Sequence, residues 1–184
     1  DIACKNPVVL FLDEVDRATL EVRQGIFELC DSRKIAGHTL HPDTLIFACV
    51  NGGQHGSEYQ VNEFDPAELD RYTVFDVEPT VEDWLSWAEG NVCGEIWDFI
   101  NHNHNHLEHK DTYEPNKIYP SRRSWERLSN ALEKVGEVKH GTTLYHLSHA
   151  FIGFEGAMAF NDYVKNYCKV CLLYTSPSPR DTNE

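Results

Sequence analysis

The strongest constraint on this chain is an apolar run that ends in two carboxylates. Residues 7–12 read Pro-Val-Val-Leu-Phe-Leu, and Asp13 and Glu14 follow directly. A run that is apolar at every position, rather than at alternate ones, is typical of a strand buried in a parallel sheet. Side chains at the carboxyl end of such a strand reach the crevice where α/β sheets bind ligands. The run therefore predicts a buried strand with two acidic residues at a candidate site.

The first 78 residues alternate between strand and helix patterns. The expected elements after the first strand are a helix over 17–30, a hairpin over 33–42, a buried strand over 44–50, a short helix from 65 to about 70 and a third strand over 73–77. This alternation is typical of an α/β layer built on a parallel sheet.

From residue 80 onward the pattern becomes helical. Thr80 and Asp83 stand at the ends of a capping box, which marks a helix start. The apolar spacing predicts helices near 80–89, 91–104, 121–135, 143–151 and 154–167. We therefore expect two parts, a partial α/β core over 1–79 and a small all-helical domain over 80–170.

The last stretch, 171–184, contains Ser-Pro-Ser-Pro and no hydrophobic period, which predicts a disordered tail. Its segment CLLYTSPSPRD resembles a translated sequencing adapter, so we expect 171–184 to be non-native. Cys168 and Cys171 form a C-x-x-C pair, but Cys171 belongs to that segment, so the pair is expected to be spurious.

Composition narrows the partners and the compartment. The net charge of −14 argues against a non-specific grip on nucleic acid, because neutralising phosphates requires clustered Lys and Arg. No run of 18 apolar residues is present, so no membrane span is expected. The chain starts at Asp1 with neither an initiator Met nor a basic and apolar leader, which indicates a piece of a longer cytoplasmic protein.

Three further motifs place polar side chains at the ends of expected elements. They are Asn51 after the strand LIFACV, Arg71 in the motif DPAELDRY, and Arg122 and Arg123 in the motif YPSRRSWERLSNAL. Amide and guanidinium groups can hydrogen-bond phosphates or an attacking water. Each motif also has a simpler alternative. Asn51 could merely cap a turn, Arg71 could pair with Asp70 or Glu68 on the surface, and the two adjacent arginines could be solvated at a helix start.

Together these motifs resemble the AAA+ family of ring ATPases, especially its MoxR-like and dynein-related branch. The resemblance runs from Pro7 to about Trp125 and covers four motifs in the expected order. It implies the C-terminal part of a parallel-sheet AAA+ core followed by a helical lid. It also implies that Asp13 binds Mg²⁺ through water and that Glu14 polarises the attacking water.

The same resemblance assigns roles to the other polar residues. It implies that Asn51 is the sensor 1 residue and that Arg71 is an arginine finger, which reaches the nucleotide of the neighbouring subunit. Arg123 aligns with the sensor 2 arginine of the lid, and Arg122 stands where proline is common. Which of these two arginines contacts the nucleotide stays open at the level of sequence.

The function implied by the resemblance is ATP hydrolysis with Mg²⁺ by a homo-oligomeric ring, expected to be a hexamer. Such rings act in a chaperone-like way, remodelling or maturing partner proteins, and von Willebrand factor A proteins are among the expected clients. The alternative is a non-catalytic scaffold or binding module of AAA+ shape.

One element of such a site is missing from this chain. The phosphate-binding pattern G-x-x-x-x-G-K-S/T occurs nowhere, and only 12 residues precede Asp13. In the family this loop lies several dozen residues before the acidic strand, so we expect it to lie upstream. The chain alone is therefore expected to bind ATP very weakly and not to hydrolyse it.

A histidine tract offers a competing hypothesis. On one helix His102, His106 and His109 would share a face. Two histidines four residues apart on a helix can bind Zn²⁺. Only Glu108 stands near them as a further ligand, so a polar helix end and loop is the favoured interpretation over a metal-binding helical protein.

Overall fold

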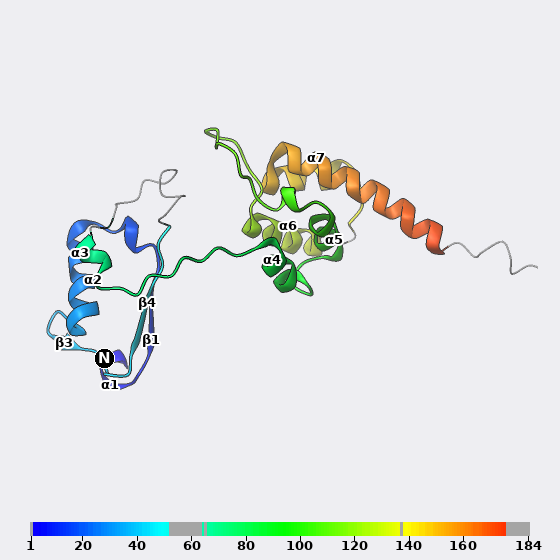
Figure 1. Cartoon of the computed structure of the whole chain (residues 1–184). Coiled ribbons are helices and arrows are strands. Elements are labelled where there is room, and N and C mark those ends of the chain that lie inside the picture. Colours follow the sequence, from blue (N-terminus) through cyan, green and yellow to red (C-terminus); the bar gives the residue numbers. More distant parts are fainter. Residues whose placement is uncertain (1, 52–63, 65, 137, 176–184) are drawn as a thin grey trace, which may run out of the picture. The chain divides into compact units, whose positions relative to one another are not determined.

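The computed structural model describes residues 2–51, 64, 66–136 and 138–175, with side chains as far as Asn166. The chain divides into two compact units, unit 1 over Asp1–Val77 and unit 2 over Glu78–Glu184 (Figure 1). Sequence places the boundary at 79/80, and the contacts place it two residues earlier.

Unit 1 is a mixed α/β unit built around two parallel strands. After the short helix α1 (Ile2–Lys5), β1 (Val9–Leu12) pairs with β4 (Leu45–Ala48), with Val9 opposite Leu45 and Leu12 opposite Ala48. Parallel strands need a long crossover connection. Here it contains α2 (Leu20–Ser32) and the small antiparallel pair β2 (Lys34–Ile35) and β3 (His38–Thr39). The expected parallel pairing and hairpin are thus confirmed.

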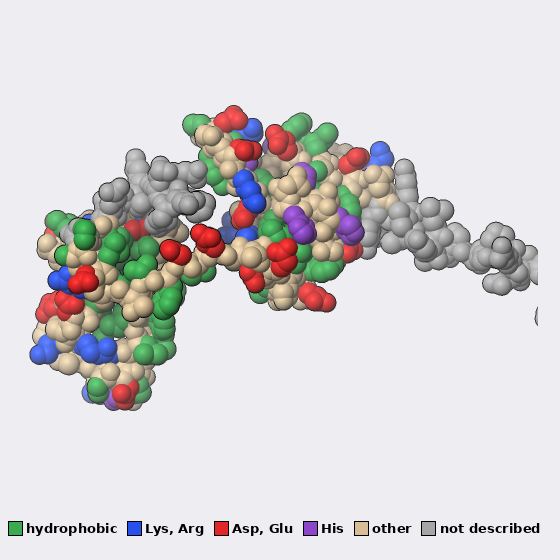
Figure 2. All heavy atoms as spheres, viewed as in Figure 1, with side chains coloured by type: hydrophobic (Ala, Val, Ile, Leu, Met, Phe, Trp, Pro, Cys, Tyr) green, Lys and Arg blue, Asp and Glu red, His purple; other side chains and the backbone are tan. Residues whose placement is uncertain are grey.

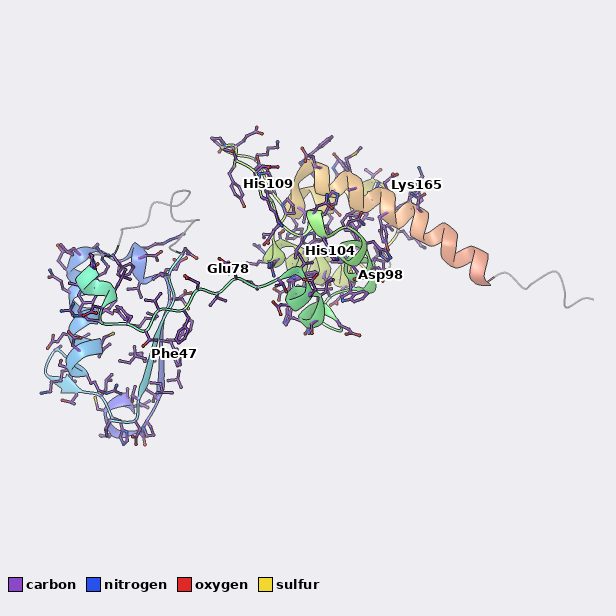
Figure 3. All side chains as sticks on the ribbon, in the orientation of Figure 1. Phe47, Glu78, Asp98, His104, His109 and Lys165 are labelled. Carbon is purple, nitrogen blue, oxygen red and sulfur yellow. The ribbon has the colours of Figure 1, made fainter. Side chains whose placement is uncertain are left out.

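One face of this strand pair is uncovered, so the expectation of strands buried on both faces is wrong. Val9 and Phe11 are 64% and 60% exposed, and their neighbours Leu45 and Phe47 are 56% and 52% exposed. Hydrophobic side chains gather along this flank of unit 1 (Figure 2), and Phe47 projects from β4 (Figure 3). Within unit 1, no described element packs on this face. Burial of a strand face depends on packing partners, which a local sequence pattern does not reveal.

The expected third strand over 73–77 is also absent. After α3 (Pro66–Leu69) the described chain through Val77 has no regular structure, and Phe75 is 80% exposed. A strand exists only where its N–H and C=O groups meet a neighbouring ladder. No described strand lies alongside this segment, so its alternating pattern stays extended and unpaired.

Unit 2 is all-helical in its described residues. Its elements are α4 (Val81–Ala88), α5 (Gly94–His102), the short 3₁₀ turn η3 (His104–His106), α6 (Arg122–Val135) and α7 (Thr142–Thr175). The expected capping box at α4 is confirmed, since the Thr80 hydroxyl accepts from the Asp83 N–H at 3.1 Å and the Asp83 carboxylate accepts from the Thr80 N–H at 2.8 Å. The apolar core gathers around Trp125, Phe99 and Phe160, all within 2% of full burial.

Helix α7 carries a break at Gly153, close to where sequence separates helices 143–151 and 154–167. Gly153 has φ 75, outside the helical region. A Cβ at this position would collide with the carbonyl oxygen of Ile118. Glycine is therefore required twice over, by the left-handed φ and by the close approach of a neighbouring backbone.

Beyond the break, α7 continues to Thr175. The expectation of disorder from residue 171 is thus wrong for 171–175, while 176–184 lie outside the described residues. The C-x-x-C pair lies outside the described side chains. Within the described part of the chain, no helix has both the length and the apolar character that a membrane span requires.

Candidate functional site

The acidic pair lies where sequence predicts it, directly after the carboxyl end of β1. Asp13 and Glu14 are both exposed. Glu14 adopts φ 54 and ψ 40, a left-handed conformation that costs a non-glycine residue about 1–2 kcal/mol. The Asp13 carboxylate accepts a hydrogen bond from the Glu14 N–H at 3.0 Å. The chain therefore turns sharply at Glu14 and enters the 3₁₀ turn η1 (Val15–Arg17).

The Glu14 side chain forms an ion pair with Arg17, three residues later. Its carboxylate lies 3.3 Å from the Arg17 guanidinium, and both side chains are nearly half-exposed. Exposed ion pairs of this kind contribute about 0–1 kcal/mol, so the pair holds Glu14 only weakly. The carboxylate stays open to solvent and to an incoming ligand.

Asn51 follows the end of β4 and is tied to the turn after β1. The Cys49 N–H donates to the Leu12 carbonyl at 2.8 Å, and the Val15 N–H donates to the Cys49 carbonyl at 3.3 Å. The Asn51 N–H donates to the Asp16 carboxylate at 2.9 Å. These bonds bring the acidic pair and the amide residue to the same edge of the strand pair. The loop over 52–63 lies outside the described residues.

Sequence reasoning missed Asp16. Its side chain is 2% exposed, and Val15 beside it is 3% exposed, whereas Glu14 and Arg17 on either side are exposed. Nothing in the hydrophobic period marks an aspartate in a turn as buried. The available signal was a third carboxylate within four positions of the strand end.

Arg71 is held along α2 rather than beside the acidic pair. Its Nε donates to the Asp31 carboxylate at 2.8 Å, a second nitrogen donates to the Ala67 carbonyl, and the guanidinium lies 5.6 Å from the centre of the Phe27 ring. Asp31 stands about 16 Å of helix rise beyond Leu20, the first residue of α2. Arg71 thus forms a surface ion pair with Asp31, which is 40 residues away and is neither Asp70 nor Glu68, the partners considered from the sequence.

The segment that carries Arg71 is anchored to α2 by two further contacts. Arg23 and Glu68 form a buried ion pair at 3.5 Å, with both side chains 8% exposed. The Tyr72 hydroxyl accepts from the Cys30 thiol at 3.7 Å. Burial, and then the contact with Cys30, raises the pKa of the Tyr72 hydroxyl above its usual range, so it stays neutral.

In unit 2 the two adjacent arginines have different surroundings. Arg122 makes a bidentate pair with Glu108, with N–O distances of 3.1 and 3.2 Å, and also donates to the carbonyls of Pro79 at 2.7 Å and Thr80 at 2.8 Å. Arg123 is exposed, and its guanidinium has no hydrogen bond or ion pair with another described residue. Of the two arginines, Arg123 has the guanidinium that is unengaged.

The histidine tract does not form the single helical face that sequence considered. Helix α5 ends at His102, which contacts the Asp98 carbonyl at 2.7 Å. His106 packs 5.3 Å from the Phe99 ring, and burial lowers its pKa. His109 stacks on Tyr119 at 3.9 Å, away from His104 (Figure 3). In the described part of the chain, no three His, Cys, Asp or Glu side chains come close enough to hold a metal.

A cavity of about 270 Å³ lies between the end of α6 and the start of α7. Its lining includes Leu132, Val138 and Leu147 and none of the residues that sequence singled out. The polar groups at the strand ends of unit 1 have the more specific chemistry, so the candidate site stays there.

The chain matches no family model, and no curated protein and no solved structure is significantly similar to it.

Proposed function

We propose that this chain is part of an AAA+-type ATPase and carries the hydrolysis side of its nucleotide site. One observation carries the proposal. Two parallel strands end together, and hydrogen bonds hold the Asp13-Glu14 turn after the first beside Asn51 after the second. Such an edge is where α/β sheets bind ligands, and carboxylate and amide groups are what phosphate hydrolysis with a metal uses.

Of the two expected ligands, Mg²⁺ is the one whose chemistry the residues present suit. The Asp13 carboxylate is exposed, and only one of its oxygens accepts from the Glu14 N–H, so it offers the hard oxygen donors that Mg²⁺ prefers. The metal, when bound, neutralises charge on the phosphates. Asp13 would hold the metal, Glu14 would accept the proton of the attacking water, and the Asn51 amide would orient that water.

The place of Arg71 supports action between subunits. An arginine finger must reach a phosphate, yet Arg71 lies along α2 in its own chain, away from Glu14. A homo-oligomeric ring, expected to be a hexamer, would present it to the neighbouring subunit. Arg123, whose guanidinium is unengaged, is the better candidate for the lid arginine than Arg122. Protein clients, including those of von Willebrand factor A type, belong to the same proposal.

A non-catalytic scaffold of the same shape is the second candidate. It is favoured by one observation, the lack of any G-x-x-x-x-G-K-S/T pattern in the 184 residues. The two functions differ in whether the coding sequence before Asp1 supplies that loop.

The test compares this chain with a version extended upstream by about 60 residues, enough for a phosphate-binding loop and its helix. We expect the extended chain to hydrolyse ATP with Mg²⁺, and Glu14→Gln to lower kcat about 100-fold or more while ATP still binds. Glu28→Gln, an exposed glutamate on α2, is the matched control and should leave kcat unchanged.

The 184 residues alone should release no phosphate above background. ATP hydrolysis by these 184 residues alone would contradict the expectation that the phosphate-binding half of the site lies outside them. An extended chain that contains no phosphate-binding pattern and binds no ATP would favour the scaffold instead.

A further inference from the structure

Asp16 is a buried carboxylate that the proposed catalytic roles do not use. It is 2% exposed, in a unit whose other acidic groups near the site are exposed. One oxygen accepts the Asn51 N–H at 2.9 Å. The other oxygen is buried and has no hydrogen-bond partner among the described residues.

This arrangement is a poor way to stabilise a fold. Burying a carboxylate is costly, and a single hydrogen bond from a neutral N–H offsets only part of that cost. The bond does, however, link two segments that are 35 residues apart, the turn after β1 and the end of β4. The Val15 N–H bond to the Cys49 carbonyl runs beside it, so the turn is attached at two consecutive residues.

The residue that this attachment controls is Glu14. A left-handed conformation at a non-glycine residue persists only where the surroundings impose it. Before the turn, β1 is fixed by its ladder to β4. After the turn, Val15 and Asp16 are fixed to Cys49 and Asn51. Glu14 lies between the two anchors, and its conformation follows from them.

We infer that Asp16 is a positioning residue, which holds the Glu14 and Asn51 backbones in a fixed relation across the strand ends. The effect of this positioning on catalysis rests on the proposed function, whereas the positioning of the two backbones does not. Asp16 touches no reacting atom in this scheme and acts through its two neighbours.

The positioning is tested on this chain by NMR. A positive φ shortens the distance between the amide proton and Hα of the same residue, so Glu14 should give a strong intraresidue NOE. The Asn51 amide should exchange slowly with solvent. Asp16→Leu, which removes the acceptor at similar volume, should abolish both signatures. Asp16→Asn, which keeps an oxygen acceptor, should retain both, and Asp43→Asn, at an exposed surface aspartate, should change neither.

A measurement on the unaltered chain keeps the inference testable if Asp16→Leu does not fold. A scalar coupling across the hydrogen bond, from the Asn51 amide nitrogen to the Asp16 carboxyl carbon, should be detectable by NMR, because the Asn51 N–H donates to that carboxylate. Absence of this coupling in a chain whose other hydrogen-bond couplings are seen, or an unchanged Glu14 NOE in a folded Asp16→Leu, would overturn the inference.

The extended chain supplies the catalytic readout. Asp16→Leu should lower kcat on the order of 10- to 100-fold with little change in KM for ATP, because it misplaces Glu14 without removing a ligand contact. Asp16→Asn should recover most of the loss. If the extended chain has no ATPase activity, the proposed function is wrong, but the NMR test of positioning still stands. If the Asp16→Leu variant of an active extended chain keeps a normal kcat, the positioning role alone is wrong.

Discussion

At the scale of single residues, neighbours decide what identical side chains do. Arg122 and Arg123 are adjacent, yet Arg122 is held by a carboxylate and two carbonyls while Arg123 faces solvent. A planar guanidinium can satisfy such a set of acceptors at once, whereas an ammonium group cannot match that geometry. Arg122 thereby fastens the chain that enters unit 2 to the start of α6.

This contact set predicts the outcome of Arg122→Lys. We expect the free energy of unfolding of unit 2 to fall by about 1–2 kcal/mol, because a charge-assisted pair and two carbonyl contacts are lost in part. All four tryptophans of the chain lie between residues 84 and 125, so tryptophan fluorescence in urea reports on this unit. Arg123→Lys is the control, and a loss of equal size there would show that exchanging arginine for lysine in the first turn of α6, rather than losing the Arg122 contacts, accounts for the effect.

At the scale of elements, the break in α7 is fixed by a contact from a distant segment. Gly153 has φ 75, and the Ile118 carbonyl occupies the space that a side chain would need. Elsewhere in unit 2, helices begin with local signals such as the capping boxes at Thr80 and Ser121. Local chemistry thus starts the helices, and a non-local contact determines where α7 bends.

Gly153→Ala should therefore be strongly destabilising. The substitution meets both an unfavourable φ and a backbone oxygen that cannot rotate away, so we expect a loss of at least about 2 kcal/mol in urea unfolding. Gly94→Ala is the matched control, since Gly94 begins α5 and a methyl group added there would meet no atom within 4 Å. That variant should be neutral or slightly stabilised.

The start of α4 predicts a pH dependence. Hydrogen bonds from the Thr80 backbone and then the Thr80 hydroxyl, with a smaller effect of Arg122, lower the pKa of Asp83 below its usual 3.8. A carboxyl whose pKa is lower in the folded state stabilises the fold above the unfolded value and loses this contribution as pH falls through the folded value. The Tm of unit 2 should thus drop below about pH 4, and less so in Asp83→Asn. An equal drop in both proteins would exclude Asp83 as a source.

At the scale of the whole molecule, the two units bury very different amounts of apolar surface. Among the described apolar residues, unit 1 fully buries only Val15 and Leu29, whereas unit 2 buries a continuous cluster around Trp125. Stability rises with the apolar area removed from water, and unit 1 also leaves one strand face open. The units therefore differ in how firmly they are folded.

We expect urea to unfold unit 1 before unit 2. Far-UV circular dichroism should begin to change at a lower urea concentration than tryptophan fluorescence, because every tryptophan is in unit 2. A truncated chain that begins at Glu78 should keep the fluorescence transition and lose the early one. A single transition, coincident by both probes, would contradict this order.

Sequence could predict the features that depend on near neighbours. The parallel strands, the capping box at Thr80 and the break near Gly153 each have a local pattern. The features it could not predict depend on distant partners. A strand over 73–77 would have required hydrogen bonds to a neighbouring strand. The pairing of Arg71 with Asp31 spans 40 residues. The Glu14 turn is determined by Asp16 and Asn51, whose bond has no signature in the hydrophobic period.

The Arg122 contacts have a mechanical consequence. The Arg122 guanidinium donates hydrogen bonds to the carbonyls of Pro79 and Thr80, immediately before the first residue of α4. If the segment before α4 were pulled, the tension would act on the hydrogen bonds of Arg122 before it reached the first turn of α4. The force would pass through Glu108 and α6 into the packed helices, so α4 would be shielded from unwinding. Without the Arg122 contacts, α4 would be the first helix of unit 2 to unwind under tension.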